Sequence, residues 1–279
     1  SPDGFSLDFA TKAIFRGPPK ITIMLMKKSS SGELDIYSFP KLDDLGFTSF
    51  VTGRRGGASP APFDSLNTSV SVGDTEANVS ENMAKIKKSA RYKNLWAPVQ
   101  VHGNKVAVID SDQPSSPVEA DAVITCVSNL MVAVRTADCL PILLADPKRK
   151  IAGAVHAGRK GTQLGVVGET ITKMAERFDC DPSNIHAGLG PCIRSCCYEV
   201  DEESAKKFHD CCGGSGKRRI DMIEANVDQL FKAGLSKENI YDSGVCTSCE
   251  NAEFFSHRVG NGVTGRFFSG VWLNDATSG

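Results

Sequence analysis

The pattern of apolar and polar positions predicts strands and helices in mixed order along the chain. Short β-rich runs bounded by turn residues predict strands at 106–109, 122–125, 131–134, 142–145 and 151–155. Apolar residues at three- and four-residue spacing predict an amphipathic helix at 78–92. Further helical patterns lie at 158–178, 202–209 and 222–233, and β-like runs at 253–256 and 266–272. Without any repeat of fixed period, this mixture predicts an α+β fold in which helices cover sheets.

The N-terminal part of the chain divides into two regions. Residues 1–20 contain Gly and Pro without periodicity, so we expect an irregular segment there and a single domain over residues 21–279. We expect a polar turn at 27–32 between two apolar, strand-like runs. The opening Ser1-Pro2-Asp3-Gly4 has neither an initiator Met nor a signal-peptide pattern, so we expect upstream sequence to be missing.

Composition narrows the class of protein. The 279 residues are 41% hydrophobic and 23% charged, which suits a globular domain with a full core. A net charge of -1 argues against nucleic acid as a partner. The apolar runs 21–26 and 140–145 are far shorter than the roughly 20 residues that span a bilayer. Ten scattered cysteines are unlike a disulfide framework, so we expect a reducing compartment, the cytoplasm.

Two histidines and one cysteine lie in distinctive short motifs. His102 lies in Gln-Val-His-Gly-Asn-Lys-Val, Cys139 in Thr-Ala-Asp-Cys-Leu-Pro and His156 in Ala-Val-His-Ala-Gly-Arg-Lys-Gly. Each lies at or just past the end of a predicted strand, where a rigid element delivers its side chain to a loop-lined cleft. Two imidazoles and a thiolate can hold zinc and leave a fourth position open. On spacing alone, however, a buried thiol and hydrogen-bonded histidines are the commoner interpretation.

Charged residues near these motifs suit phosphate binding and proton transfer. Arg54 lies in a long Gly-rich loop, and Arg159 begins a predicted helix whose free backbone amides attract anions. For both arginines, solvated charges in a glycine-containing turn are the commoner interpretation. Asp138 adjoins Cys139 and is a candidate proton shuttle or hydrogen-bond partner of a ligand imidazole, and we favour the shuttle slightly.

A second cysteine pattern occurs near the C-terminus. Cys246-Thr247-Ser248-Cys249 resembles half of a zinc knuckle, for which Cys192, Cys196 or Cys197 would supply the other half. The remaining cysteines form no second CxxC pair, so the spacing favours structural cysteines over a second zinc site.

Together these motifs resemble the YfiH-type family, also called the laccase-domain or polyphenol oxidase family, and especially its animal laccase domain-containing members. The resemblance runs from about Phe47 to the C-terminus. Besides the three motifs above, it rests on Arg54-Arg55-Gly56-Gly57, Ser65-Leu66-Asn67, Val72-Gly73-Asp74, Gly190-Pro191-Cys192-Ile193, Cys246-Thr247 and Phe254-Phe255-Ser256. One departure is that the bacterial pattern His-Ala-Gly-Trp-Arg-Gly has Arg159 and Lys160 here in place of Trp and Arg.

The resemblance implies a fold, a metal and an activity. The implied fold is a single domain with α/β/β/α layers and mixed sheets, and the implied zinc ligands are His102, Cys139 and His156. The implied activity is cytosolic phosphorolysis of adenosine, inosine, guanosine or methylthioadenosine, with phosphate as co-substrate, together with deamination of adenosine. Arg258 and Arg266 match arginines near the family's C-terminus and are candidate substrate or phosphate ligands, although surface ion pairs would equally explain them.

Three other hypotheses follow from the same residues. Five histidines are too few for a multicopper laccase, so any phenol oxidation would reflect adventitious copper in the zinc site. A thiolate–imidazole pair of Cys139 with His156 or His102 would attack an electrophilic carbon without a metal. The resemblance implies citrulline cleavage to ornithine and isocyanate as such a ureido reaction. The third hypothesis is a non-enzymatic metabolic scaffold that binds protein partners through a missing N-terminal region.

Overall fold

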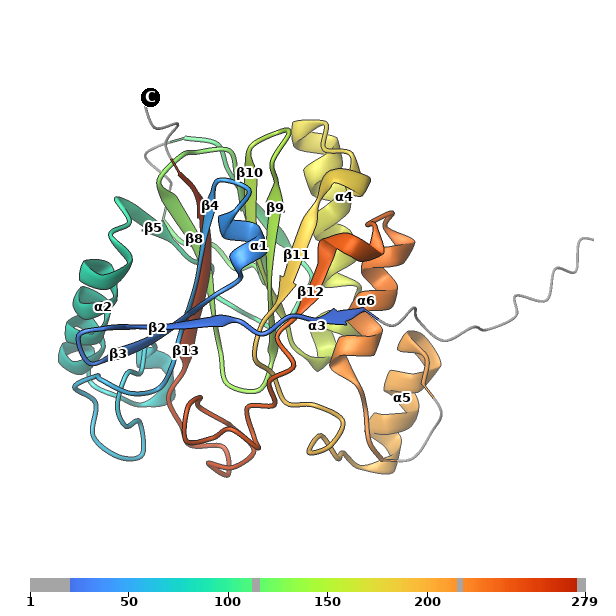
Figure 1. Ribbon diagram of the computed structural model, residues 1–279. Helices are drawn as coiled ribbons and strands as arrows, with labels where there is room; N and C mark the ends of the chain where they lie inside the picture. Colours follow the sequence, from blue (N-terminus) through green and yellow to red (C-terminus); the bar gives the residue numbers. More distant parts are fainter. Residues whose placement is uncertain (1–20, 112–115, 215–217, 275–279) are drawn as a thin grey trace, which may run out of the picture.

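Two sheets form the centre of the molecule. The computed structural model describes residues 21–111, 116–214 and 218–274 (Figure 1). In spatial order, one sheet contains β1 (Thr22–Ile23), β12 (Ile240–Asp242), β11 (His186–Leu189), β9 (Leu140–Asp146), β10 (Ile151–Ala157), β7 (Ala122–Thr125) and β6 (Val106–Ile109). The other contains β2 (Lys27–Ser31), β3 (Leu34–Ser38), β4 (Phe47–Thr52), β13 (Phe267–Leu273), β8 (Leu130–Thr136) and β5 (Asn94–Trp96).

Both sheets are mixed. In the first sheet β9, β10 and β7 pair antiparallel, whereas β6 with β7 and β11 with β12 pair parallel. In the second sheet β5 pairs parallel with β8, and the other neighbours pair antiparallel. The helices are α1 (Pro40–Asp43), α2 (Glu76–Ala90), α3 (Arg159–Gln163), α4 (Val166–Phe178), α5 (Glu202–Cys212) and α6 (Met222–Lys232), with short 3-10 turns at Val70–Val72, Pro182–Asn184 and Lys237–Asn239.

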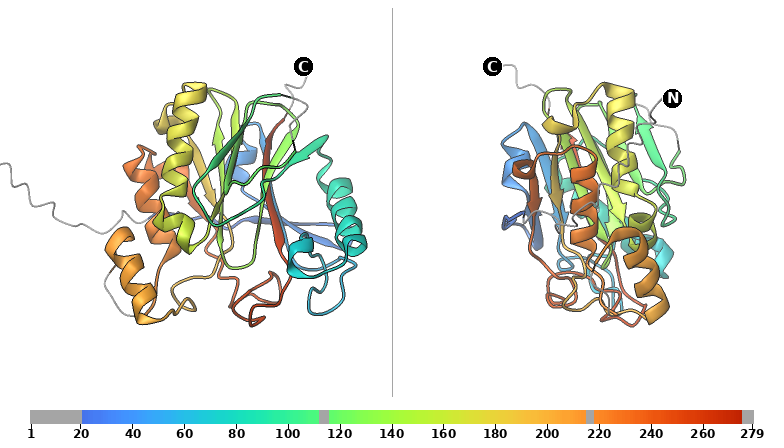
Figure 2. Two further views of the ribbon diagram at one scale, coloured as in Figure 1. Left: turned by 180° about the vertical axis from the view of Figure 1, so that it is seen from behind. Right: turned by 90° about the vertical axis from the view of Figure 1, so that its right-hand side faces the viewer.

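The sheets pack face to face and helices cover their outer faces (Figure 2). Val132 and Val134 of β8 meet Leu143 of β9 in the buried cluster between the sheets. Helices α4 and α6 bury apolar residues on the outer face of the β9–β10 sheet, and α2 buries Ile86 against Met131 of the other sheet. The α/β/β/α layers and the single α+β domain with mixed sheets are therefore confirmed.

Most predicted elements are present with small shifts at their ends, but two predictions were wrong. Segment 27–31 is the edge strand β2, not a turn, because it pairs along its length with β3 and its described side chains face solvent, where apolar residues are not needed. The run 253–256 is not a strand: its amides bond locally, Phe254 N to Glu250 O at 3.0 Å, while both phenylalanines enter the core.

Two further expectations concern the long predicted helix and the N-terminal segment. The predicted helix 158–178 is two helices, because Gly165 takes a left-handed conformation (φ +76°) between α3 and α4. The irregular segment expected at 1–20 lies outside the described residues, so the proposed domain limits stay a prediction. None of the helices in the described ranges has the length and apolarity needed to cross a membrane.

Candidate active site

The three residues predicted as metal ligands converge. His102 lies in the loop between β5 and β6, Cys139 in the turn that joins β8 to β9, and His156 in β10. Their potential ligand atoms all lie within 4.8 Å of one another. The antiparallel register of β9 and β10 explains part of this arrangement, because Pro141, two residues after Cys139, lies opposite His156. His102 reaches the cluster with a left-handed backbone (φ +59°).

A buried carboxylate that the sequence analysis missed holds two of these residues. Asp121 is fully buried just before β7, and its Oδ1 lies 2.7 Å from His156 Nδ1. It also accepts the backbone amides of His102 at 2.9 Å and Gly103 at 2.6 Å. Nδ1 of His156 is thus engaged, which leaves Nε2 for a ligand. The pairing of β7 with β10 would have indicated Asp121 as a neighbour of His156, because the backbone carbonyl of Asp121 accepts a hydrogen bond from the His156 amide.

The thiol and the imidazole shift each other's titration. Burial raises the pKa of Cys139, but the charge and hydrogen bonds of His156 and His102 outweigh it and lower the pKa to about 6. Burial lowers the pKa of His156, but Cys139 and Asp121 outweigh it and raise the pKa to about 9. The thiolate, which is the form that binds metals, is therefore favoured near neutral pH.

A glycine leaves room beside the three side chains. A Cβ on Gly158 would lie 3.0 Å from His102 Cδ2, 3.2 Å from Cys139 Sγ and 3.6 Å from His156 Cε1. Two nitrogens and one thiolate are donors that suit zinc, and three protein ligands leave one position of a tetrahedron open. The residues present therefore fit a metal ion with an exchangeable fourth ligand.

The cluster forms one wall of a cavity of about 730 Å³, a volume typical of small-molecule sites. The rest of the lining includes charged and aromatic side chains. Four arginines and one tyrosine contribute to it, namely Arg135, Arg159, Arg258, Arg266 and Tyr198. Three of these arginines were predicted from the sequence. Arg135 and Tyr198 were not, because the motifs around them carry no catalytic pattern.

Protein carbonyls fix two of the predicted arginines. Arg258 Nη2 donates to Glu199 O at 2.7 Å, and its guanidinium carbon lies 5.6 Å from the Tyr198 ring centre. Arg266 Nη1 donates to Thr264 O at 3.0 Å, and burial lowers the pKa of this arginine. Among the described residues, Arg159 has neither a hydrogen-bond nor an ion-pair partner, so its half-buried guanidinium is available to an anion in the cavity.

Asp138 and Arg54 differ from the others in their surroundings. Asp138 lines the cavity, but its Oδ1 accepts from Thr247 Oγ1 at 2.6 Å and its Oδ2 from the Arg258 amide at 2.7 Å. The carboxylate that orients an imidazole is Asp121, and a proton-shuttle role for Asp138 stays a prediction. The structure does not bring Arg54 to this cavity: Arg54 donates to Asp64 and Asn251 and lines a separate hollow of about 330 Å³.

Comparison with known proteins identifies the class. Residues 48–274 match the family model described as "Multi-copper polyphenol oxidoreductase laccase", and the chain belongs to this family. Purine nucleoside phosphorylase YlmD of Geobacillus stearothermophilus is 33% identical over 246 residues, which cover 80% of this chain and 89% of that protein. Purine nucleoside phosphorylase SCO2081 of Streptomyces coelicolor is 38% identical over 233 residues, or 80% of this chain and 94% of the relative.

An animal relative and two solved structures agree with this assignment. Purine nucleoside phosphorylase LACC1 of Mus musculus is 32% identical over 241 residues, 81% of this chain but 55% of the mouse protein, so this chain spans about half of it. The crystal structure of YlmD from Geobacillus stearothermophilus superposes with a TM-score of 0.82 at 29% identity, covering 90% of this chain and 99% of that one. Bacillus licheniformis hypothetical protein YfiH gives 0.79 at 30% identity, with 88% and 98% covered.

Proposed function

We propose that the chain is a zinc-dependent purine nucleoside phosphorylase. The observation that carries the proposal is that a His–Cys–His cluster and four arginines line the same cavity. The names of the bacterial and mouse relatives support the reaction class. Zinc is preferred to a multicopper centre because the only other cluster of potential ligands found among the described residues consists of four cysteines, not histidines.

The arginines that line the cavity are the candidate phosphate ligands. Arg159 offers an unpaired guanidinium, while Arg258 and Arg266 are held in place by backbone carbonyls. Phosphorolysis breaks the glycosidic bond through a sugar that carries positive charge, so an anion held beside the sugar both attacks it and stabilises it. In this chain Arg159 stands where the bacterial pattern has Trp, which places a cation in the cavity lining where the aromatic ring would be.

The remaining residues orient and activate the reactants. His102, Cys139 and His156 would hold the zinc ion, with Asp121 fixing the His156 ring. When bound, zinc supplies Lewis-acid polarisation of a substrate oxygen or nitrogen and activates water. Asp138, buried beside Cys139 on the cavity wall, is the candidate group for moving a proton to the departing purine. Hydrolytic deamination of adenosine is a different reaction, in which an activated water would attack C6 of adenine and displace ammonia. We include this activity and methylthioadenosine phosphorolysis in the proposal.

The direct test is product analysis with and without phosphate. Wild type and Cys139→Ala are incubated with adenosine, inosine and methylthioadenosine, and free base, ribose 1-phosphate (or its methylthio analogue) and deaminated nucleoside are quantified by mass spectrometry. Phosphate-dependent base release that Cys139→Ala abolishes is the expected result. An Arg54→Ala variant serves as a control, because Arg54 lies outside the cavity. Absence of turnover of every nucleoside by zinc-loaded wild type would refute the proposal.

One observation favours a second candidate function. A thiol with its pKa lowered to about 6 beside two imidazoles is also the arrangement of a nucleophilic cysteine, which would cleave a ureido substrate such as citrulline. Chelation separates the two: the zinc enzyme loses activity with a chelator and regains it with zinc, whereas the thiolate enzyme survives chelation but not alkylation. We further propose a reducing compartment such as the cytosol, which the ten free cysteines support.

A further inference from the structure

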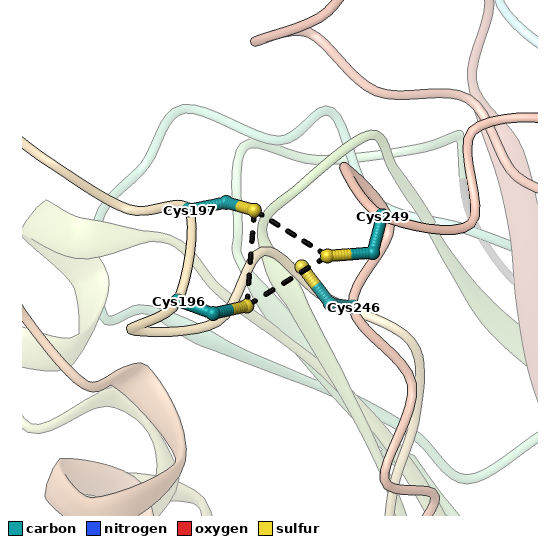
Figure 3. A group of neighbouring side chains, drawn as sticks. All are labelled: Cys196, Cys197, Cys246 and Cys249. Atoms are coloured by element: carbon teal, nitrogen blue, oxygen red, sulfur yellow. Dashed lines mark hydrogen bonds between the residues drawn. The ribbon is translucent and has the colours of Figure 1, made fainter.

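Four cysteines gather about a point outside the candidate active site (Figure 3). Cys196 and Cys197 lie in the loop that follows β11, and Cys246 and Cys249 lie in the turn that follows β12. All four Sγ atoms lie within 4.8 Å of one another. The separation is 3.7 Å between Cys196 and Cys197, 3.9 Å between Cys196 and Cys249, and 3.5 Å between Cys197 and Cys249.

These distances fit one metal ion with four thiolate ligands. With zinc–sulfur bonds of about 2.3 Å in a tetrahedron, the sulfur atoms lie roughly 3.8 Å apart. A disulfide would require about 2.05 Å between two sulfurs, and all ten cysteines are free. An iron–sulfur cluster distributes its thiolates over two or more iron atoms, so its four sulfurs would not all lie this close together.

The surrounding backbone suits thiolates. The amides of Cys249, Arg194 and Ser248 donate to the sulfur of Cys246. Amides that point at the first sulfur of a Cys-x-x-Cys turn stabilise the charged ligand before any metal arrives.

Positive charge also lies close to the cluster. Arg219 Nη1 donates to the carbonyl of Cys196 at 3.1 Å, and Arg258 Nη1 donates to that of Cys197 at 3.4 Å. Four thiolates around a divalent ion carry a net charge of about −2, which these guanidinium groups partly offset. The exposed thiols of Cys196 and Cys249 give an ion access from solvent.

We propose that Cys196, Cys197, Cys246 and Cys249 bind a structural zinc ion. A closed set of four thiolates leaves no position for substrate, so this ion stabilises structure instead of taking part in chemistry. The proposal does not depend on the activity proposed above, because it concerns different residues.

This zinc ion would tie together two loops that build the cavity wall. Cys197 precedes Tyr198, and its carbonyl accepts from Arg258. Thr247, between Cys246 and Cys249, donates to Asp138 beside the His–Cys–His cluster. Loss of the ion would therefore loosen Tyr198, Arg258 and Asp138 together, although none of them would be its ligand.

Zinc stoichiometry in paired variants tests the proposal. The full chain is purified under reduction, loaded with zinc, desalted and measured by native mass spectrometry and elemental analysis. In a Cys139→Ala background, which removes a ligand of the active-site cluster, we expect one zinc per chain. Adding Cys249→Ser should remove that zinc, whereas adding Cys211→Ser should retain it. Cys211 is a matched control because it is exposed like Cys249 and its sulfur likewise lies near another thiol, 3.2 Å from that of Cys212.

Zinc absent from Cys139→Ala, or fully retained after Cys249→Ser, would overturn the proposal. If Cys249→Ser fails to fold, cobalt titration of Cys139→Ala decides, because four thiolates give intense sulfur-to-cobalt absorption that fewer thiolates do not. A stable disulfide among the four cysteines after purification, detected as a loss of two hydrogens in mass, would also overturn it. If Cys139→Ala loses nucleoside turnover but still binds this zinc, the four-cysteine site is independent of the active-site cluster.

Discussion

Replacing Asp121 tests whether a buried carboxylate holds the active-site cluster together. The side chain is fully buried and receives four contacts, from His156 Nδ1 and from the amides of Val101, His102 and Gly103. Hydrogen bonds to a charged group contribute about 1.5–3 kcal/mol each, but four bonds to one carboxylate are not additive. Removing one partner of a buried ionic pair costs about 3–5 kcal/mol.

We therefore expect Asp121→Ala to lower the free energy of unfolding by about 4 kcal/mol, and Asp121→Asn by roughly half as much, because the amide keeps the shape and one acceptor. For a chain of this size, 4 kcal/mol corresponds to a fall in Tm of roughly 8–16 °C. Losing the hydrogen bond that orients a ligand imidazole typically weakens metal binding about 10–100-fold. Asp121→Asn should thus bind zinc at least tenfold more weakly than wild type, a loss of about 1.4 kcal/mol in binding free energy.

Calorimetric unfolding gives the Tm, and competition with a chromophoric chelator gives the zinc affinity. Asp110→Asn is the matched control, because Asp110 is 61% exposed and lies 3.6 Å from Arg177. Such a surface pair contributes about 0–1 kcal/mol, so the control should resemble wild type in both measurements. An Asp121→Asn protein with wild-type zinc affinity and a Tm within about 1 °C of wild type would refute the reasoning.

Three further predictions follow from local geometry. Gly158→Ala should weaken zinc binding roughly tenfold in a chelator competition, because the added Cβ would crowd His102, Cys139 and His156. Gly168→Ala lies in α4 with open space around the added Cβ, so it should instead stabilise the fold by about 1 kcal/mol in thermal unfolding. Gly57→Ala should destabilise the chain by about 3 kcal/mol in urea unfolding, because its Cβ would overlap the backbone of Ser65. The hydrogen bond from Lys28 lowers the pKa of Glu253 below its ordinary value of 4.5. The stabilisation from the Glu253 carboxylate is therefore complete above pH 4.5 and is lost as the pH falls through the pKa of the folded state. Glu253→Gln should weaken this acid dependence when the free energy of unfolding is measured against pH.

The sequence predicted the three residues of the His–Cys–His cluster but not the buried carboxylate that holds two of them, because the position of that carboxylate depends on strand register. His102, Cys139 and His156 could be predicted because each has a chemically distinctive side chain at the end of a β-rich run. Asp121 could not, because an acidic residue before a strand is ordinary until the pairing of β7 with β10 places it beside an imidazole. Strands β8, β9 and β10 could be predicted because apolar residues fill them on both faces.

Long-range contacts explain the remaining differences. The polar strand β2 forms because β3 is available to pair with it, which local propensity does not encode. The spacing of the cysteines favoured structural cysteines over a second zinc site, but the parallel pairing of β11 with β12, continued by the bridge between Cys192 and Cys246, brings the adjacent pair to the Cys-x-x-Cys turn. Arg54 was grouped with the phosphate ligands because its loop is rich in glycine, but its guanidinium is already occupied by Asp64 and Asn251.

The position of β13 has a consequence for synthesis of the protein. This strand is the last one described, yet it lies between β4 and β8 and separates two halves of the six-stranded sheet. A nascent chain that has not yet extended past residue 273 cannot join those halves, nor can it supply Arg258 and Arg266 before they are translated. Folding of this sheet on the ribosome must therefore wait until nearly all of the described chain has emerged, and until then β4 and β8 lack the strand that pairs with both of them.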